Sequence, residues 1–296
     1  MCIRDRLRRK PPGKLLKSAH AVDRECRVMT ALYDTDVPVP KTFGYCDDET
    51  VIGTPFFVMD HVIGNIYWEL LLPGCDPNQR REIYLSMNDT IAKLHNVDFD
   101  KVNLADYGKH ENYMDRQIHR WTKQYKDSET QMIPEINELI EWLPKNIPSD
   151  QETSIVHGDF RLDNMIFDPI THEVKAILDW ELSTLGNPIA DFTYHMMSWR
   201  LPAGAKGLGM MGSDLKSLNI PSESEYAELY YKKTGREKID NWDFYMAYNI
   251  FRLAGIAQGI VGRVRDGTAS SSEAKNYEAF VPILGKLGWS IVEGIK

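Results

Sequence analysis

The sequence contains three polar residues whose side chains could together take part in a reaction: Asp159, Asn164 and Asp179. Each has a side-chain oxygen, and such oxygens suit a hard cation such as magnesium, which usually takes one or two carboxylates together with phosphate oxygens of a substrate. Phosphoryl transfer uses such an ion on the phosphates and a further carboxylate that accepts the proton of the attacking hydroxyl group. The residue types therefore predict phosphoryl transfer if the fold brings the three side chains together.

A β-hairpin can bring them together. The apolar stretches Met165–Phe167 and Val174–Leu178 predict two short strands, and the residues between them favour a turn. Asn164 and Asp179 are equally far from the midpoint of this segment, so a symmetric hairpin places them side by side at its open end. Asp159 lies in the loop that enters the same end.

The order of these residues is the one found in kinases. Asp159 and Asn164 form the pattern D-x-x-x-x-N, and after the hairpin a further aspartate follows at Asp179, as in a kinase catalytic loop and its metal-binding Asp. The alternative makes His157-Gly158-Asp159 an ordinary turn and Asp179 a strand cap. Spacing, hairpin and residue types together favour the catalytic interpretation.

The elements around this hairpin predict an α+β fold. Before a hinge at Gly64, we expect a strand at Leu7-Arg8 and a helix over Lys14–Leu32, followed by strands over Thr42–Cys46 and Pro55–Asp60. After the hinge, helical periodicity is found over Pro77–His95, Tyr113–Tyr125, Ile133–Leu143, Glu223–Thr234, Asp243–Val264 and Tyr277–Ile295. We therefore expect a small β-rich lobe at residues 1–62 and a larger, mostly helical lobe at residues 63–296 that carries the hairpin.

Composition excludes several classes of protein. The 296 residues are 43% hydrophobic and 26% charged, which is ordinary for a globular protein, and the net charge of −8 argues against general nucleic-acid binding. The four cysteines form no CxxC pair, so neither a zinc site nor a disulfide framework is expected. No apolar run is long enough for a membrane helix. We expect a cytoplasmic protein.

The motif HGDFRLDN, followed by LDWE, resembles the aminoglycoside phosphotransferase and choline kinase branch of the kinase-like superfamily. The stretches LRRKPPGKLLKSAHAVDRE, VIGTPFFVMDHVIG, RWTKQY, LDWELSTLGNP and LAGIAQG further resemble the kinase domain fused to certain acyl-CoA dehydrogenase family members, and its stand-alone bacterial relatives. The resemblance covers nearly the whole chain from Leu7 onward. It implies a bilobal protein-kinase-like fold and a phosphotransferase that uses ATP and Mg²⁺.

The resemblance also implies roles for residues near the hairpin. Asp159 matches the catalytic base, and Asn164 and Asp179 match the magnesium ligands. Arg161 matches the position of a lysine that contacts the transferred phosphate in protein kinases, although a surface arginine is an equal alternative.

Three further residues are expected to support the loop. Asp191 matches an aspartate that holds the catalytic loop through backbone hydrogen bonds, and His157 is expected to be a structural hydrogen-bonding residue. Glu181 is expected near the metal, as a ligand or behind one.

In the small lobe, Glu25 matches the helix glutamate that holds a phosphate-binding cation, which falls at Arg8, with Lys10 as the fallback. The alternative for Glu25 is a solvated helix residue. The segment Met59, Asp60, His61 and Val62 matches the hinge whose backbone meets adenine, although it could be a plain linker.

The glycine loop that covers the phosphates in kinases should precede Arg8, and none of the residues there is glycine. We therefore expect that the chain lacks the first strands and the glycine loop of its small lobe, and that Met1–Arg6 is not native sequence.

The resemblance implies a small-molecule hydroxyl acceptor of the hydroxyacyl-CoA type. Arg120, Trp121 and Lys123 are candidate acceptor contacts because an aromatic face with cations suits a phosphorylated, ring-bearing substrate, and an exposed amphipathic helix explains them equally well. An aminoglycoside or amino-alcohol acceptor is the alternative within the same reaction. A nucleotide-binding module without catalysis is the alternative outside it, because of the absent glycine loop.

Overall fold

The computed structural model describes residues 7–10, 21–149, 152–204, 207–238, 241–267 and 277–295. Its contacts group the chain into two compact units. Unit 1 comprises Met1–Lys109, Thr153–Asp191 and Ser198–Lys238, and unit 2 comprises His110–Glu152, Phe192–Met197 and Ile239–Lys296. The two units are defined by the contacts within each of them. They do not test the predicted division into lobes after Val62, which stays a prediction.

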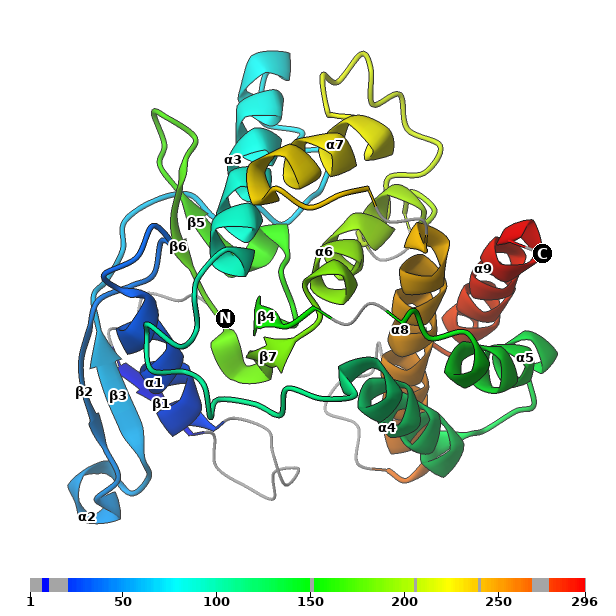
Figure 1. Cartoon of the computed structure of the whole chain (residues 1–296), viewed down its shortest axis with the longest axis horizontal. Helices are drawn as coiled ribbons and strands as arrows, with labels where there is room; N and C mark the ends of the chain where they lie inside the picture. Colours follow the sequence, from blue (N-terminus) through cyan, green and yellow to red (C-terminus); the bar gives the residue numbers. More distant parts are fainter. Residues whose placement is uncertain are drawn as a thin grey trace. The chain divides into compact units, whose positions relative to one another are not determined.

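Unit 1 begins with a three-stranded antiparallel sheet in the order β1-β3-β2 (Figure 1). Its strands are β1 (Leu7–Arg9), β2 (Thr42–Cys46) and β3 (Phe56–Met59). Helix α1 (Val22–Leu32) packs against β2 and β3 and against the 3-10 turn η3 (Trp180–Leu182). Because α1 packs against both the sheet and η3, which are far from each other in the sequence, it can position a side chain between them.

Helix α3 (Pro77–His95) begins at a capping box. The Asp76 carboxylate accepts from the N–H groups of Asn78 and Gln79, and the Gln79 side chain accepts from the Asp76 N–H. Such a cap satisfies donors that the first turn of a helix cannot pair itself. Helix α7 (Glu223–Thr234) packs against α3.

The rest of unit 1 holds two short antiparallel ribbons. Strand β4 (Ser154–Val156) pairs with β7 (Thr184–Gly186), and β5 (Met165–Phe167) pairs with β6 (Val174–Ile177) to form the predicted hairpin. The remaining elements are α2 (Glu49–Ile52), η2 (Leu162–Asn164), α6 (Pro188–Met196), which continues into unit 2, and η4 (Met197–Trp199).

Unit 2 is helical. It contains α4 (Tyr113–Ser128), α5 (Pro134–Trp142), η1 (Leu143–Lys145), α8 (Trp242–Arg265) and α9 (Phe280–Ile295). Helix α8 packs against both α4 and α9 (Figure 1). The close approach depends on glycine, since a Cβ at Gly262 would lie 2.8 Å from the Cβ of Ser128 in α4.

The predicted elements are confirmed where the structure describes them. The bounds of β2, β5, α3 and α7 are as predicted, and the other predicted strands and helices after residue 21 differ from their predicted bounds by a few residues. The helix expected over Lys14–Leu32 is confirmed from Val22, and residues 11–20 lie outside the described ranges.

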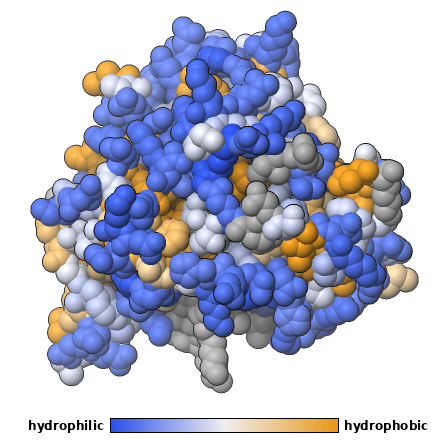
Figure 2. Space-filling model, in the orientation of Figure 1, coloured by the Kyte–Doolittle hydropathy of each residue, from blue (hydrophilic) through white to orange (hydrophobic). Residues whose placement is uncertain are grey.

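No helix in the described part of the chain is both long and apolar enough to cross a membrane. The face drawn in Figure 2 is mainly hydrophilic, with apolar residues in small separate groups.

Candidate active site

The hairpin β5–β6 brings Asn164 and Asp179 to the same end, with a register that differs from the symmetric prediction. The Leu178 N–H donates to the Asn164 carbonyl oxygen over 2.8 Å, so Leu178 lies opposite Asn164 and Asp179 follows it. Asp179 has a left-handed backbone, with φ of 61° and ψ of 57°. Aspartate tolerates this conformation better than most residues.

The turn of the hairpin explains the difference in register. It closes on the pair Asp168–Glu173, where the Asp168 N–H donates to the Glu173 carbonyl oxygen over 2.8 Å. This pair centres the hairpin one residue earlier than predicted, and the extra residue Lys175 in β6 restores only part of the offset.

Asn164 is bound to Asp159 through its side chain. The amide nitrogen of Asn164 donates to the Asp159 carbonyl oxygen over 2.9 Å and to the Asp159 carboxylate over 3.1 Å. The amide oxygen of Asn164 accepts no hydrogen bond in the described part of the chain. It is therefore available as a ligand for a cation.

The imidazole of His157 connects the two segments that carry the carboxylates. His157 is buried; its Nε2 lies 2.9 Å from the Leu178 carbonyl oxygen, and the Asp159 N–H donates to its Nδ1 over 3.2 Å. These bonds need a neutral ring with its proton on Nε2. His157 is thus placed to fix the backbone of Asp159 relative to the residue before Asp179.

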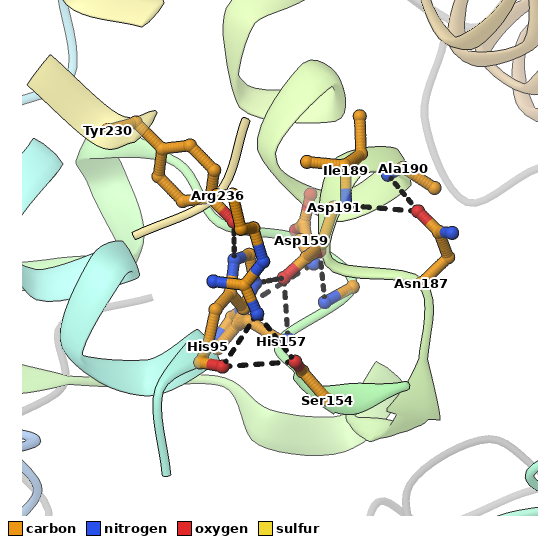
Figure 3. Close-up of polar contacts among 11 residues, drawn as sticks. His95, Ser154, His157, Asp159, Asn187, Ile189, Ala190, Asp191, Tyr230 and Arg236 are labelled. Carbon is orange, nitrogen blue, oxygen red and sulfur yellow. Dashed lines mark hydrogen bonds and ion pairs between the residues drawn. The ribbon is translucent and has the colours of Figure 1, made fainter. Parts of the chain in front are cut away.

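Asp191 holds the start of the predicted catalytic loop, residues 157–164. Its carboxylate oxygens accept from the backbone N–H groups of His157 and Gly158, each over 2.8 Å (Figure 3). Burial alone would raise the pKa of Asp191, but the hydrogen bond and charge of His95, together with His157, hold that pKa below its ordinary value.

The sequence did not reveal the residues behind Asp191. His95, at the end of α3, places its Nε2 3.2 Å from Asp191 and its Nδ1 2.8 Å from the hydroxyl of Tyr230 in α7. Figure 3 shows His95 between these two side chains. Ser154 and Arg236 donate to the His95 carbonyl oxygen over 3.0 and 3.1 Å. The available signal was a histidine in the last turn of a predicted helix, where interaction with the helix dipole explains it as well.

Arg8 lies at the meeting point of β1, α1 and the hairpin. It donates from two nitrogens to the Glu25 carboxylate, each over 3.1 Å. Its Nη2 also lies 3.4 Å from Asp179 and 3.8 Å from Glu181. The predicted pair of Arg8 with Glu25 is therefore present in the geometry. Lys10 instead makes backbone contacts, in which its N–H donates to the Pro55 carbonyl oxygen over 3.1 Å and its carbonyl oxygen accepts from the Thr54 hydroxyl over 3.4 Å.

The charges around Arg8 do not balance. Burial lowers the pKa of Arg8, but Glu25 and the two other carboxylates more than offset this and raise it. Burial raises the pKa of Glu25, which Arg8 offsets only in part. One guanidinium thus faces three carboxylates, and a divalent cation at this place would compensate the surplus negative charge.

This donor set fits magnesium with phosphates as further ligands. Within the described ranges, no group of three or more His, Cys, Asp or Glu side chains is arranged to hold a metal ion. Asp159, Asn164 and Asp179 instead offer two carboxylates and an amide oxygen, which is the small protein share that Mg²⁺ takes when a nucleotide supplies the rest.

Arg161 lies beside the catalytic loop. Its guanidinium bonds both carboxylate oxygens of Asp163, and its Nε lies 3.9 Å from the Asp159 carboxylate. The side chain is 38% exposed. It is a cation next to Asp159 that is held in place and partly open to solvent.

The hinge segment is fastened to the hairpin. Asn65 and Phe167 exchange two backbone hydrogen bonds of 2.8 Å, and a Cβ at Gly64 would lie 2.4 Å from the Phe167 carbonyl oxygen. Val62 packs against the buried cluster of Ile166, Ala176 and Leu178.

The upstream part of the predicted hinge joins the sheet. The Asp60 N–H donates to the Lys41 carbonyl oxygen over 2.8 Å, and Met59 is the buried last residue of β3. The backbone groups of His61 and Val62 make no such bond in the described part of the chain.

The three candidate acceptor residues lie on α4 in unit 2, and the structure separates them. Lys123 is exposed and pairs with Asp127 one turn away, over 2.8 Å. Trp121 is buried, and the guanidinium carbon of Arg120 lies 5.3 Å from its ring centroid. Lys123 therefore has the contacts of an ordinary residue on a helix surface. Arg120 and Trp121 are in contact with each other, and their role in binding the acceptor stays a prediction.

Comparison with known proteins agrees with this geometry. Residues 6–228 match the family described as "Phosphotransferase enzyme family". The chain is 45% identical over 284 residues to mouse acyl-CoA dehydrogenase family member 10, a match that covers 96% of this chain and 27% of the mouse protein. It is 42% identical over 284 residues to human acyl-CoA dehydrogenase family member 11, covering 95% of this chain and 36% of the human protein. The chain thus spans about a quarter to a third of the length of these relatives.

A solved structure matches over nearly the whole chain. The crystal structure of a "putative aminoglycoside phosphotransferase" from Ralstonia eutropha has 48% sequence identity and a TM-score of 0.91, covering 97% of this chain and 85% of the other. The match confirms the predicted α+β, kinase-like fold.

Proposed function

Because the chain belongs to the phosphotransferase enzyme family, we propose that it transfers the terminal phosphoryl group of ATP, with Mg²⁺, to a hydroxyl group of a hydroxyacyl-CoA-type ester. That the chain is a phosphotransferase for small-molecule hydroxyl groups follows from its family. What we propose beyond this is the identity of the nucleotide, the metal and the ester acceptor, and the roles of the residues.

Asp159 is the proposed base. Its backbone is fixed through His157 and its carboxylate through Asn164, so little motion is needed before it orients the acceptor hydroxyl and accepts its proton. General-base catalysis of this kind contributes about 100- to 10,000-fold to a rate.

Asn164 and Asp179 are the proposed metal ligands. Mg²⁺, when bound, neutralises negative charge on the phosphate oxygens as the phosphoryl group is transferred. The chain contributes the orientation of the ligands, since the hydrogen bonds from the Asn164 amide nitrogen to Asp159 turn its amide oxygen away from that residue.

Arg8 is the proposed phosphate-binding cation in the small lobe, and Arg161 is proposed to contact the transferred phosphoryl group. Glu25 holds Arg8 with two hydrogen bonds, a geometry that a charged carboxylate stabilises strongly. The segment Met59–Val62 is proposed to meet the adenine ring with its backbone.

The ester acceptor is supported by the names of the curated relatives, which are acyl-CoA dehydrogenase family members. A phosphotransferase segment within such proteins would act on the same class of thioester as the rest of the chain. Phosphorylation turns a hydroxyl group into a better leaving group, which is a chemical reason to place the two activities together.

The single observation that carries the proposal is the junction at Arg8, where Glu25, Asp179 and Glu181 meet one cation at the end of the hairpin. The test is acceptor-dependent release of ADP, with the phosphorylated product identified by ³¹P NMR. Asp159→Asn should lower kcat for a hydroxyacyl-CoA about 100-fold or more, whereas Asp127→Asn, an exposed aspartate of α4, should not. Turnover that is the same in both variants would refute the assignment of Asp159.

An aminoglycoside acceptor is the second candidate, because the Ralstonia eutropha protein carries that description. Parallel assays with kanamycin-type aminoglycosides and with hydroxyacyl-CoA esters distinguish the two. A higher kcat/KM for the aminoglycosides would replace the ester proposal and leave the phosphotransferase chemistry intact.

A further inference from the structure

A polar cluster lies within unit 1, where α1 meets η3. It consists of Arg24 of α1, Tyr107 of the segment between α3 and α4, and Ser183, which follows η3. Arg24 donates to the Tyr107 carbonyl oxygen over 2.6 Å and to the Ser183 carbonyl oxygen over 3.4 Å. Its guanidinium carbon also lies 4.1 Å from the ring centroid of Tyr107. One side chain of α1 therefore contacts both of the other members.

The hydroxyl groups of Tyr107 and Ser183 form a hydrogen-bonded chain with one direction. The Ser183 hydroxyl donates to the Trp180 carbonyl oxygen over 2.6 Å, so its oxygen accepts from the Tyr107 hydroxyl, 2.5 Å away. The Tyr107 hydroxyl oxygen also lies 3.2 Å from the Arg24 carbonyl oxygen. Burial raises the pKa of Tyr107, so this hydroxyl keeps its proton and remains a donor. A single buried side chain thus links α1 to η3.

The segment that carries Tyr107 is held on both sides. Arg27 of α1 donates to the Asn103 carbonyl oxygen over 3.0 Å. On the other side, a Cβ at Gly108 would lie 2.4 Å from the hydroxyl oxygen of Thr184. Packing as close as this leaves the segment little room to shift. Tyr107 can therefore transmit the position of one element to the other.

The linked elements carry groups of the junction at Arg8. Arg24 directly precedes Glu25, which holds Arg8 with two hydrogen bonds of 3.1 Å. Asp179 directly precedes η3 and lies 3.4 Å from Arg8. A link between α1 and η3 therefore sets how Glu25 and Arg8 lie relative to Asp179. Displacements of about 1 Å in such a set of groups can cost a reaction about 100-fold.

We propose that Tyr107 is a positioning residue that, together with Arg24 and Ser183, locks α1 to η3 and so sets the geometry of the nucleotide and metal site. The inference rests on the proposed function and adds to it residues that lie outside the motifs. In this role Tyr107 acts through Glu25 and Arg8 and needs no contact with the nucleotide. Its loss should therefore weaken the binding of nucleotide and metal and leave the acceptor unaffected.

Binding of ADP with Mg²⁺, measured by isothermal titration calorimetry, tests this role without turnover. Tyr107→Phe and Ser183→Ala each remove one hydroxyl group from the chain, and each should weaken binding about three- to tenfold. Tyr33→Phe, an exposed tyrosine at the end of α1, is the control and should bind as the wild type does. Binding as in the wild type in both Tyr107→Phe and Ser183→Ala would overturn the proposal.

A double-mutant cycle with Glu25→Gln shows whether Tyr107 acts through the junction at Arg8. Tyr107→Phe should weaken binding of ADP with Mg²⁺ when Glu25 is present and add little in the Glu25→Gln background. Losses that multiply independently would show that Tyr107 acts elsewhere and would overturn the proposal. Weaker binding in Glu25→Gln with none in Tyr107→Phe refutes the positioning role alone. Unchanged binding in Glu25→Gln refutes the proposed function at this junction, and the inference with it.

Steady-state kinetics separate positioning from a general loss of structure. Tyr107→Phe should raise the KM for ATP about three- to tenfold and leave the KM for the acceptor unchanged. An equal rise in both KM values would show a merely structural role and overturn the proposal. If Tyr107→Phe does not fold, Ser183→Ala carries the same comparisons.

Discussion

The guanidinium group of Arg8 lies 3.4 Å from a carboxylate oxygen of Asp179, although 171 residues separate them in the sequence. The contact joins β1 to the end of the hairpin β5–β6. Glu25 supports it from α1 with two bonds of 3.1 Å. Changes at this junction should therefore affect the use of the nucleotide more than that of the acceptor.

Glu25→Gln tests the junction. The neutral amide can keep one hydrogen bond to Arg8 but loses the charge interaction, which for a bond between charged groups is worth about 1.5–3 kcal/mol. We expect the KM for ATP to rise about tenfold or more, with little change in the KM for the acceptor. Asp23→Asn, an exposed residue of the same helix, is the control, and an equal KM for ATP in both variants would count against the role of Glu25.

Asp191→Asn tests how the catalytic loop is held. The pKa of Asp191 is lowered in the folded protein, so its carboxylate contributes stability above the unfolded pKa of about 3.9, and this contribution is lost as the pH falls through the lower folded value. We expect the variant to lose about 2 kcal/mol of unfolding free energy at pH 7 and to show a weaker dependence on acid. Denaturant titrations across the acid range measure both quantities. Parallel curves for the wild type and Asp191→Asn would show that Asp191 is not the titrating group.

Tyr230→Phe tests the contact behind Asp191. It removes only the hydroxyl that lies 2.8 Å from Nδ1 of His95, and an unpaired buried nitrogen costs about 1–3 kcal/mol. Chemical denaturation should show this loss in Tyr230→Phe and none in Tyr33→Phe, whose side chain is exposed. If the two variants are equally stable, the His95–Tyr230 contact does not hold the loop.

Gly64→Ala tests the close approach of the hinge to the hairpin. The added methyl group would meet the Phe167 carbonyl oxygen at 2.4 Å and a side-chain carbon of Ile166 at 2.5 Å. Overpacking of this kind costs about 1–3 kcal/mol, and we expect a lower Tm together with weaker nucleotide binding. At Gly74 a Cβ would have no neighbour within 4 Å, so Gly74→Ala should leave the Tm almost unchanged. An equal Tm in both variants would show that the backbone at Gly64 can move to accommodate the methyl group at little cost.

The sequence predicted the elements best where the signal is local. Helical periodicity predicted the bounds of α3, and the structure has the same bounds, with a capping box formed by Asp76 and Gln79 at its start. The hairpin followed from two apolar stretches, but its register did not, because nothing in the apolar pattern marks that the turn closes on the pair Asp168–Glu173.

The site was predicted only in part, for a similar reason. The spacing of a motif identified the pair Asp159–Asn164, and the family resemblance implied the pair Arg8–Glu25. Both pairs are in contact in the structure. His95 comes to Asp191 from another element. Such a contact between distant elements depends on how they pack, and no motif in a single sequence reveals it.

The affinity for a divalent ion in the nucleotide complex tests most directly whether Asp159, Asn164 and Asp179 surround one cation. Mn²⁺ can replace Mg²⁺ as a paramagnetic probe and be titrated by EPR into ADP complexes of the wild type, Asp179→Asn, Asn164→Ala and the control Asp127→Asn. We predict that Mn²⁺ binds at least about tenfold more weakly to Asp179→Asn and Asn164→Ala, because each change removes or weakens a ligand, and that the control matches the wild type. Equal Mn²⁺ affinity in all four proteins would contradict the proposed metal site.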